Sequence, residues 1–246
     1  MFIVDYYNYL SERYDYYHTR RDERVITWPL MSRPHDMIIL ILGYYLFIFL
    51  GRKIMKNQKP FELKYPLIIH NAICFLMSVY MVIEIAYQAY SNDYKLICNP
   101  VDYSEKGTGM AKVLWLFFFS KFIELMDTVF MVLRKKDNQI TVSILYTAGG
   151  DSYFSAIMNS FVHSLMYGYY TLALLGYRVW WKKYLTQLQL IQFVFNILSS
   201  FLAIYMDCDF PNWMHWSMIA YMVSFIILFG AFYKRTYKSE PKKKTA

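Results

Sequence analysis

The feature that most constrains this chain is a set of six long apolar stretches, because each approaches the length that crosses a bilayer. About 20 apolar residues span the hydrocarbon core. The stretches are Pro34–Leu50, Tyr65–Tyr87, Met110–Leu133, Tyr153–Tyr177, Tyr184–Tyr205 and Trp216–Tyr233. Since 57% of all residues are hydrophobic and 20% aromatic, the composition is typical of polytopic membrane proteins. We predict an all-α bundle of about six transmembrane helices.

No linker or change of composition separates these stretches, so residues 1–246 are predicted to form a single integral-membrane domain. Residues 1–33 would be an N-terminal extramembrane segment, which lacks the apolar core of a signal peptide. Residues 234–246 would be a basic tail in the cytosol. The net charge of +8 does not indicate nucleic-acid binding, because Lys and Arg lie in short clusters between the apolar stretches.

The loops differ in charge, and this difference predicts their sides of the membrane. Basic clusters at 51–59, 134–139, 178–183 and 233–246 should face the cytosol, whereas 91–109 and 206–215 should face the opposite side. The clusters 134–139 and 178–183 conflict with this scheme. Only the stretch Tyr153–Tyr177 crosses the membrane between them, so they would lie on opposite sides instead of both facing the cytosol. The remaining segment, 139–152, is short for a span. One crossing is therefore missing at that place.

Three ionisable side chains lie inside the stretch Met110–Leu133. A charge at the bilayer centre costs about 2.5–3.5 kcal/mol on insertion scales. On a helix, Lys121, Glu124 and Thr128 would fall within about 60° of one another, with Asp127 about 60° further round. This face either ties helices together as a structural ion-pair cluster or lines an internal cavity where it acts.

Two further polar faces occur in later stretches. One arc of about 100° holds Asn159, His163, Met166, Tyr167 and Tyr170. The histidine is either a hydrogen-bonded packing residue or a neutral imidazole that acts as base or nucleophile. A second stripe comprises Thr186, Gln189, Gln192 and Asn196; its amides either join helices or contact substrate.

The cysteines and histidines exclude some kinds of site. Cys98 and Cys208 both fall in the non-basic loops, so they either pair in an oxidising lumen or remain free thiols. Cys74 is predicted to be a packing residue. The five histidines show no metal-ligand spacing, and no metal site is predicted.

With these motifs the chain resembles the very-long-chain fatty acid elongase (ELO) family. Four segments match family motifs, in the family's order. KFIELMDT (121–128) matches the motif KxxExxDT, and RKKDNQIT (134–141) matches the loop that follows this motif. NSFVHSLMYGYY (159–170) matches HxxMYxYY, and TQLQLIQF (186–193) matches TxLQxxQF. The resemblance covers nearly the whole chain. It implies a 3-oxoacyl-CoA synthase of the endoplasmic reticulum membrane. This enzyme condenses an acyl-CoA with malonyl-CoA, with loss of carbon dioxide and without a cofactor.

The resemblance also implies roles for particular residues. The catalytic group would comprise His163, Lys121, Glu124 and Asp127. Substrate would contact Asn159, Met166, Tyr167, Tyr170, Gln189 and Gln192, while Lys135, Lys136, Lys182 and Lys183 would attract the CoA phosphates at the cytosolic mouth. The Lys243-Lys244 pair resembles a dilysine retrieval signal, which requires a cytosolic C-terminus. Partners would be the bilayer and, as the family allows, a second copy or other fatty-acid elongation enzymes.

One family feature is absent. The family carries an HxxHH box in a further membrane helix, giving seven helices, but here Gln139–Thr141 runs into VSILYTAGGDSYFSA. About 20–25 residues, the length of one span, are missing through a skipped exon, a gene-model error or a true deletion. We therefore predict greatly reduced condensing activity. The alternative is a non-catalytic relative that partners or modulates full-length elongases; a channel or transporter is less favoured, because no inverted repeat is visible.

Overall fold

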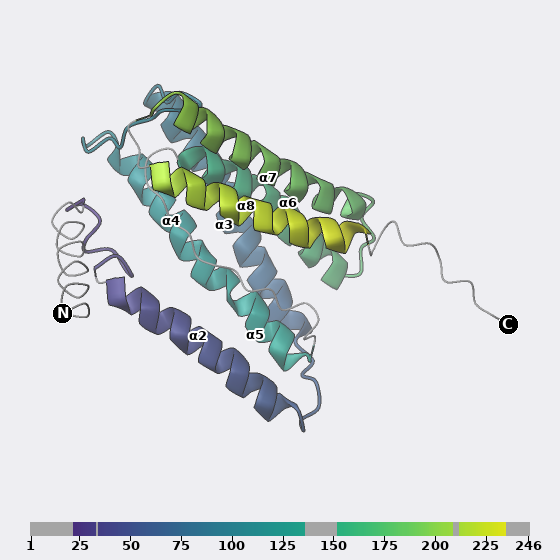
Figure 1. Cartoon of the computed structure of the whole chain (residues 1–246). Coiled ribbons are helices and arrows are strands. Elements are labelled where there is room, and N and C mark those ends of the chain that lie inside the picture. Colours follow the sequence, from purple (N-terminus) through teal and green to yellow (C-terminus); the bar gives the residue numbers. More distant parts are fainter. Residues whose placement is uncertain (1–21, 33, 136–151, 209–211, 235–246) are drawn as a thin grey trace, which may run out of the picture. The chain divides into compact units, whose positions relative to one another are not determined.

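The computed structural model describes residues 22–32, 34–135, 152–208 and 212–234, and within these ranges it contains helices and no strand (Figure 1). The helices are α2 (Pro34–Met55), α3 (Lys64–Ser91), α4 (Thr108–Glu124), α5 (Met126–Leu133), α6 (Ser152–Leu174), α7 (Lys182–Tyr205) and α8 (Asn212–Tyr233). Each predicted apolar stretch is helical over most of its length, which confirms the all-α membrane fold. Residues 1–21 of the predicted N-terminal segment, 235–246 of the tail and the connection 136–151 lie outside the described residues.

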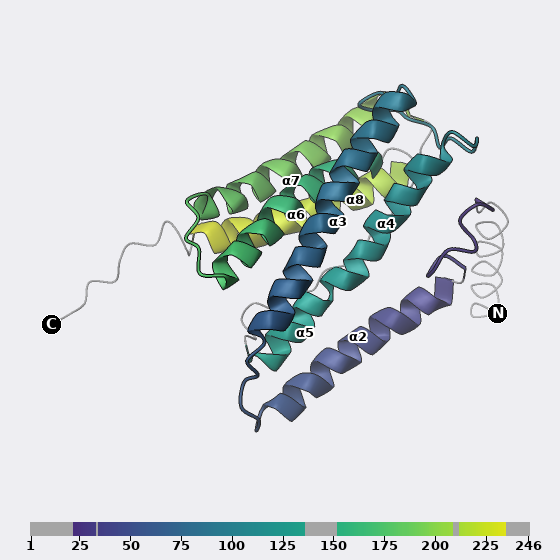
Figure 2. The ribbon, with the colours of Figure 1, turned by 180° about the vertical axis from the view of Figure 1, so that it is seen from behind.

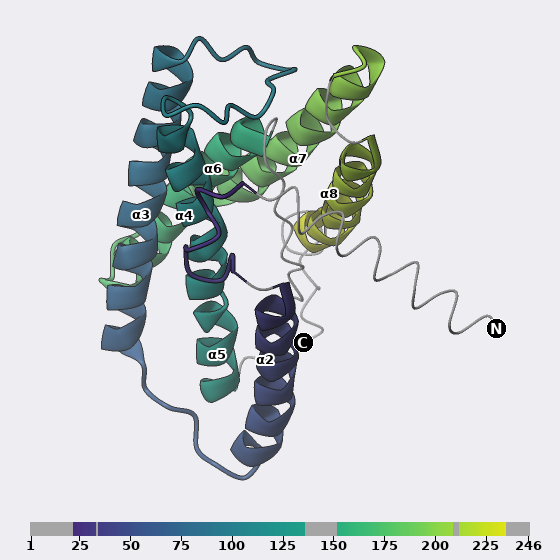
Figure 3. The ribbon, with the colours of Figure 1, turned by 90° about the vertical axis from the view of Figure 1, so that its left-hand side faces the viewer.

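The chain divides into two units, with the boundary between Lys56 and Asn57. The first unit contains α2, a helix that exposes apolar side chains along its length, among them Ile39, Leu42 and Phe49. The second contains α3 to α8. There α6 packs most extensively on α3, α7 packs against both α6 and α8 (Figure 2), and α4 lies beside α3 (Figure 3). The predicted grouping of all 246 residues into one domain stays a prediction.

Among the described residues, α2, α3, α7 and α8 are long and apolar enough to cross a membrane. The predicted stretch Met110–Leu133 is instead divided between α4, with 17 residues, and α5, with 8 residues. At the break Leu125 N–H still bonds Lys121 O, but Thr128 N–H bonds Leu125 O, three residues back. Helix α6 is long enough at 23 residues, but its Asn, His, Ser and Tyr side chains lower its hydropathy.

The helices α4–α5 and α6, which follow one another along the chain, run in the same direction. Three side-chain contacts show this direction, because each step along α4–α5 is matched by a step forward along α6. The contacts are Lys121 with Asn159, Glu124 with His163, and Asp127 with Tyr167. Helix α6 therefore begins at the end of this bundle opposite to the end where α5 stops.

The two ends of the second unit differ in chemistry. At one end, Phe61 N–H donates a hydrogen bond to Leu133 O at the end of α5. At the same end, Gln187 Nε2 of α7 donates to Tyr233 OH at the end of α8. The basic residues Lys135, Lys182 and Lys234 follow or begin these helices, so we call this the basic end. The opposite end, the disulfide end, brings together Lys95, Cys98, Tyr153 and Cys208, through a bond from Tyr153 OH to Lys95 O and a Cys98–Cys208 bridge.

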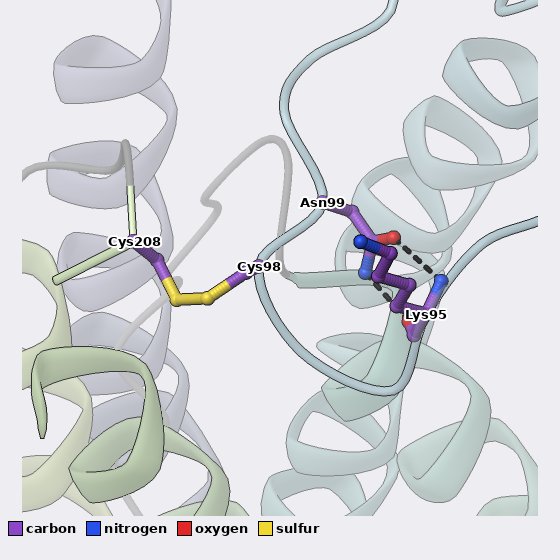
Figure 4. The surroundings of a disulfide bond; sticks show 4 residues. All are labelled: Lys95, Cys98, Asn99 and Cys208. Carbon is purple, nitrogen blue, oxygen red and sulfur yellow. Dashed lines mark hydrogen bonds between the residues drawn. A yellow bond between two sulfur atoms is a disulfide. The ribbon is translucent and has the colours of Figure 1, made fainter. Parts of the chain in front are cut away.

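The disulfide joins the α3–α4 loop to the end of α7 (Figure 4). Helix α7 ends in a turn where Asp207 adopts a left-handed φ of 51° and Cys208 N–H bonds Ala203 O at 3.1 Å. This turn presents Cys208 to Cys98, with their Cα atoms 5.0 Å apart. Beside Cys98, Asn99 accepts from Lys95 N–H at 2.8 Å and donates to Lys95 O at 2.7 Å.

Reducing this disulfide should destabilise the protein, because the bridge closes a loop with a sequence separation of 110. Closing a long loop typically stabilises by about 2–4 kcal/mol, which corresponds to a fall in Tm of about 5–15 °C. Thermal unfolding of the purified protein in detergent, with and without reductant, measures the effect. Cys98→Ser/Cys208→Ser should match the reduced protein, whereas Cys74→Ser should stay sensitive to reductant. An unchanged Tm on reduction would show that the bridge adds no stability.

Candidate intramembrane polar site

The first polar cluster joins α4 to α6 around Glu124. Lys121 Nζ lies 3.0 Å from Glu124 Oε1 and donates to Asn159 Oδ1 at 2.7 Å. Ser120 Oγ donates to Glu124 Oε1 at 3.3 Å, and His163 Nδ1 lies 3.3 Å from Oε2. The Lys121 and Glu124 side chains are 20% and 15% exposed. A shielded ion pair is tolerated when further polar contacts satisfy both partners, and these neighbours supply such contacts.

His163 turns Nδ1 toward Glu124, and this orientation determines what its other ring nitrogen can do. At 3.3 Å the two groups attract each other electrostatically without the alignment of a hydrogen bond. Because an ionised carboxylate only accepts, it favours the tautomer that carries the proton on Nδ1. Nε2 then keeps its lone pair. A neutral imidazole in this state can accept a proton or attack an electrophile.

The second polar cluster surrounds Asp127 and joins α5 to α3 and α6. His70 Nε2 lies 3.0 Å from Asp127 Oδ1, and Tyr167 OH donates to Oδ2 at 2.8 Å. Both carboxylate oxygens therefore have a partner. The predicted offset of Asp127 from the Lys121–Glu124 face agrees with this arrangement, because Asp127 contacts different side chains across the helix break.

The amide stripe of α7 faces the protein interior. Thr186, Gln192 and Asn196 are buried, whereas Gln189 is half-buried. Gln189 Nε2 donates to Met166 Sδ of α6 at 3.6 Å, and Asn196 Nδ2 lies 3.8 Å from a methionine sulfur of α8. Thioether sulfur is a weak acceptor, so these amides keep capacity for a stronger partner. Both interpretations of the stripe, helix packing and substrate contact, stay open.

Other predicted site residues lie outside both clusters. Tyr170 is 40% exposed and packs edge-on against the Tyr167 ring. Lys135 and Lys182 are exposed at the basic end, where they were expected to attract phosphates. Lys136 and the side chain of Lys183 lie outside the described residues.

No role for His70 was predicted from the sequence, because this histidine lies in none of the motifs and has no metal-ligand spacing to another histidine. A usable signal existed: His70 lies inside a predicted span, and an ionisable residue within a membrane helix marks a functional site by default. Ser120 was also missed, since a single serine in an apolar run has no distinctive pattern. In the ranges that the structure describes, no three His, Cys, Asp or Glu side chains form a group that could hold a metal ion.

Several helices long and apolar enough to cross a membrane, together with a shielded ammonium, carboxylate and imidazole on α4 and α6, define a polytopic membrane protein with an internal polar site. The GNS1/SUR4 (ELO) family model matches residues 29–245. The chain belongs to this family. Similar proteins include the very long chain fatty acid elongase 4 of Homo sapiens, 44% identical over 92% of this chain and 78% of the relative. Elongase 7 of Drosophila melanogaster is 38% identical over 97% of this chain and 81% of the relative.

The relatives also indicate a difference in length. Very long chain fatty acid elongase 4 of Mus musculus is 42% identical, over 97% of this chain and 83% of its own length. That match extends over 260 positions, more than the 246 residues of this chain. Since 97% of the chain is about 239 residues, about 21 positions of the mouse protein have no counterpart here.

Proposed function

We propose that this chain has the fold, and the catalytic groups other than the HxxHH box, of an enzyme that condenses a long-chain acyl-CoA with malonyl-CoA. The observation that carries this proposal is the contact between Glu124 and His163 inside a shielded polar cluster, in a family whose similar members are named fatty acid elongases. The acyl group would pass from CoA to a nucleophile of the enzyme, malonyl-CoA would lose carbon dioxide, and the resulting carbanion would take up the acyl group from that nucleophile. The product is a 3-oxoacyl-CoA.

The residues of the first cluster fit two requirements of this reaction. His163 Nε2 supplies a lone pair that would attack the carbonyl of the acyl thioester and release CoA as its thiolate. The acyl-imidazolium so formed would be stabilised by Glu124, in the manner of a triad carboxylate, and would pass its acyl group to the enolate, which restores the neutral imidazole. The enolate formed by decarboxylation needs a fixed positive partner, and the Lys121 ammonium is held between Glu124 and Asn159.

We propose that the basic end faces the cytosol and that the protein resides in the endoplasmic reticulum membrane. Exposed Lys135 and Lys182 lie at that end, where they would attract CoA phosphates and where basic loops are retained. The disulfide lies at the opposite end, as expected of a lumenal environment. This orientation places the C-terminus in the cytosol.

We further propose that the helix with the HxxHH box is missing from this chain. Two observations support this. Helices α4–α5 and α6 run in the same direction, so a crossing segment belongs between them. About 21 positions of the mouse relative have no counterpart, which is the length of one span. Because the box and His163 would act as one unit, loss of the box costs most of the condensing activity.

The family reaction can be tested through substrate binding, which does not require turnover. A photoreactive long-chain acyl-CoA should label the α6 peptide that contains His163, and unlabelled acyl-CoA should compete. Labelling that spares this peptide, or that acyl-CoA does not compete, would contradict the proposal. A basic-loop variant, Lys182→Glu, should weaken labelling in a salt-dependent manner because it acts through the CoA phosphates.

A second candidate function is supported by the same missing segment. A relative that binds acyl-CoA or contacts elongases without completing the reaction would modulate full-length elongases. Co-purification of the tagged chain with elongation enzymes, together with changed product lengths in the cell and no turnover by the isolated chain, would favour this role. Turnover by the isolated chain without any associated enzyme would exclude it.

A further inference from the structure

His70 of α3 belongs to none of the sequence motifs, yet it lies at the centre of the second polar cluster. We propose that His70 is a positioning residue that acts through Asp127 and Tyr167 to hold the His163 imidazole in its orientation. The inference rests on the proposed function only for the role of His163 in acyl transfer. The contacts that carry it are the two hydrogen bonds to Asp127 and the packing of Tyr167 on His163.

The first step concerns which nitrogen of His70 carries a proton. Its Nε2 faces the Asp127 carboxylate at 3.0 Å, and since an ionised carboxylate only accepts, Nε2 must be the donor. Cys74 Sγ lies 3.7 Å from the same nitrogen. A nitrogen that already donates cannot take the thiol proton, so His70 and Cys74 do not form a nucleophile and base. His70, which is only 8% exposed, therefore directs its Nε2 proton to Asp127, while its ring packs edge-on against Phe130 and Tyr167.

The second step concerns Asp127, which lies just after the break between α4 and α5. His70 holds one oxygen from α3, and Tyr167 holds the other from α6 at 2.8 Å. Such a carboxylate fixes the distance between three helices across the point where the α4–α5 hydrogen-bond pattern is interrupted. Loss of the His70 donor would leave a part-buried carboxylate oxygen without its partner and free Asp127 to rotate.

The third step leads to His163. Tyr167 is 1% exposed, and its ring lies edge-on to the His163 ring with the centroids 5.8 Å apart. Because the phenol is bonded to Asp127, the Tyr167 side chain cannot swing about its Cα–Cβ bond to another rotamer without breaking that bond. It therefore forms a fixed wall beside His163. On its other side His163 faces Glu124, so the wall and the carboxylate together determine where Nε2 points.

The test measures the reactivity of His163 rather than condensation. Purified protein in detergent is treated with diethyl pyrocarbonate, which acylates neutral imidazole, and modification of the His163 peptide is followed by mass spectrometry. His70→Leu should slow acylation of His163 about five- to tenfold, the size of effect expected for coupled neighbours. His70→Gln places an amide donor near the position of Nε2 and should stay within about twofold of the unchanged protein. Cys74→Ala should have no effect.

Several outcomes would overturn the proposal. Equal rates in His70→Leu and the unchanged protein would show that His163 does not depend on His70. A rate in His70→Gln as low as in His70→Leu would show that the donor is irrelevant and that only the ring shape matters. Slowed acylation in Cys74→Ala would contradict the donor assignment of Nε2. Rates are compared well below the Tm of each variant, so that a loss of stability alone does not change them.

A double variant provides an independent check. Tyr167→Phe removes the next bond in the same chain of contacts, so it should slow acylation of His163 as His70→Leu does. If both act through Asp127, the double variant should be no slower than the slower single variant. Additive effects would contradict a shared route. Absence of condensation products would bear on the proposed function alone, because acylation by a small reagent requires neither substrate nor the missing segment.

Discussion

Inserting the HxxHH segment of an ELO relative between Gln139 and Ser152 should raise condensing activity at least about 100-fold over the chain as it stands. General acid–base and nucleophilic groups contribute about 10²–10⁴-fold each, and groups that act as a unit lose nearly all of this when one is removed. The inserted span would also supply the crossing that two parallel consecutive helices require. Elongation products from both chains, expressed in cells without their own elongases, are measured by mass spectrometry of fatty acids.

The control for this experiment is the same insertion combined with His163→Ala, which should return the activity to that of the chain without the insertion. Near-normal elongation by the original chain would refute the prediction of reduced activity. An insertion protein that is stable and correctly oriented but no more active would show that the box does not complement His163. Glycosylation tags at the disulfide end and on the C-terminus establish the orientation.

The substitution Lys121→Leu should be the most destabilising single change in the polar site. It leaves Glu124 and Asn159 without their cation in a shielded position, and breaking a buried pair by removing one partner costs about 3–5 kcal/mol. Thermal unfolding in detergent measures the loss. The double change Lys121→Leu/Glu124→Leu should recover a large part of it, because no uncompensated charge remains.

Lys182→Leu serves as the matched control, because Lys182 is exposed and surface substitutions usually change stability by less than about 0.5 kcal/mol. If Lys121→Leu were as mild as this control, the Lys121–Glu124 pair would be accessible to water. A double variant that is less stable than Lys121→Leu alone would show that the carboxylate has a favourable role independent of the lysine, through Ser120 or His163.

Much of the site was predictable, because contacts one turn apart on a helix follow from spacing. Lys121 with Glu124 is such a pair, because a spacing of three residues places both on one helix face. His70 with Asp127 was not predictable in this way. Their sequence separation is 57, and nothing in either segment specifies that α3 meets α5 at that level. Only side-chain packing between helices sets that register.

The sequence by itself determined where the helices lie and which motifs they carry. Hydrophobic length and polar spacing are properties of a single segment, and the bilayer imposes the same length requirement on every segment. Tertiary structure alone decided the break at Leu125 and the shared direction of α4–α5 and α6. It also decided that the charged face divides into two clusters, one with Glu124 beside His163 and one with Asp127 beside His70. Each of these depends on how neighbouring helices satisfy one another's polar groups, which no single segment encodes.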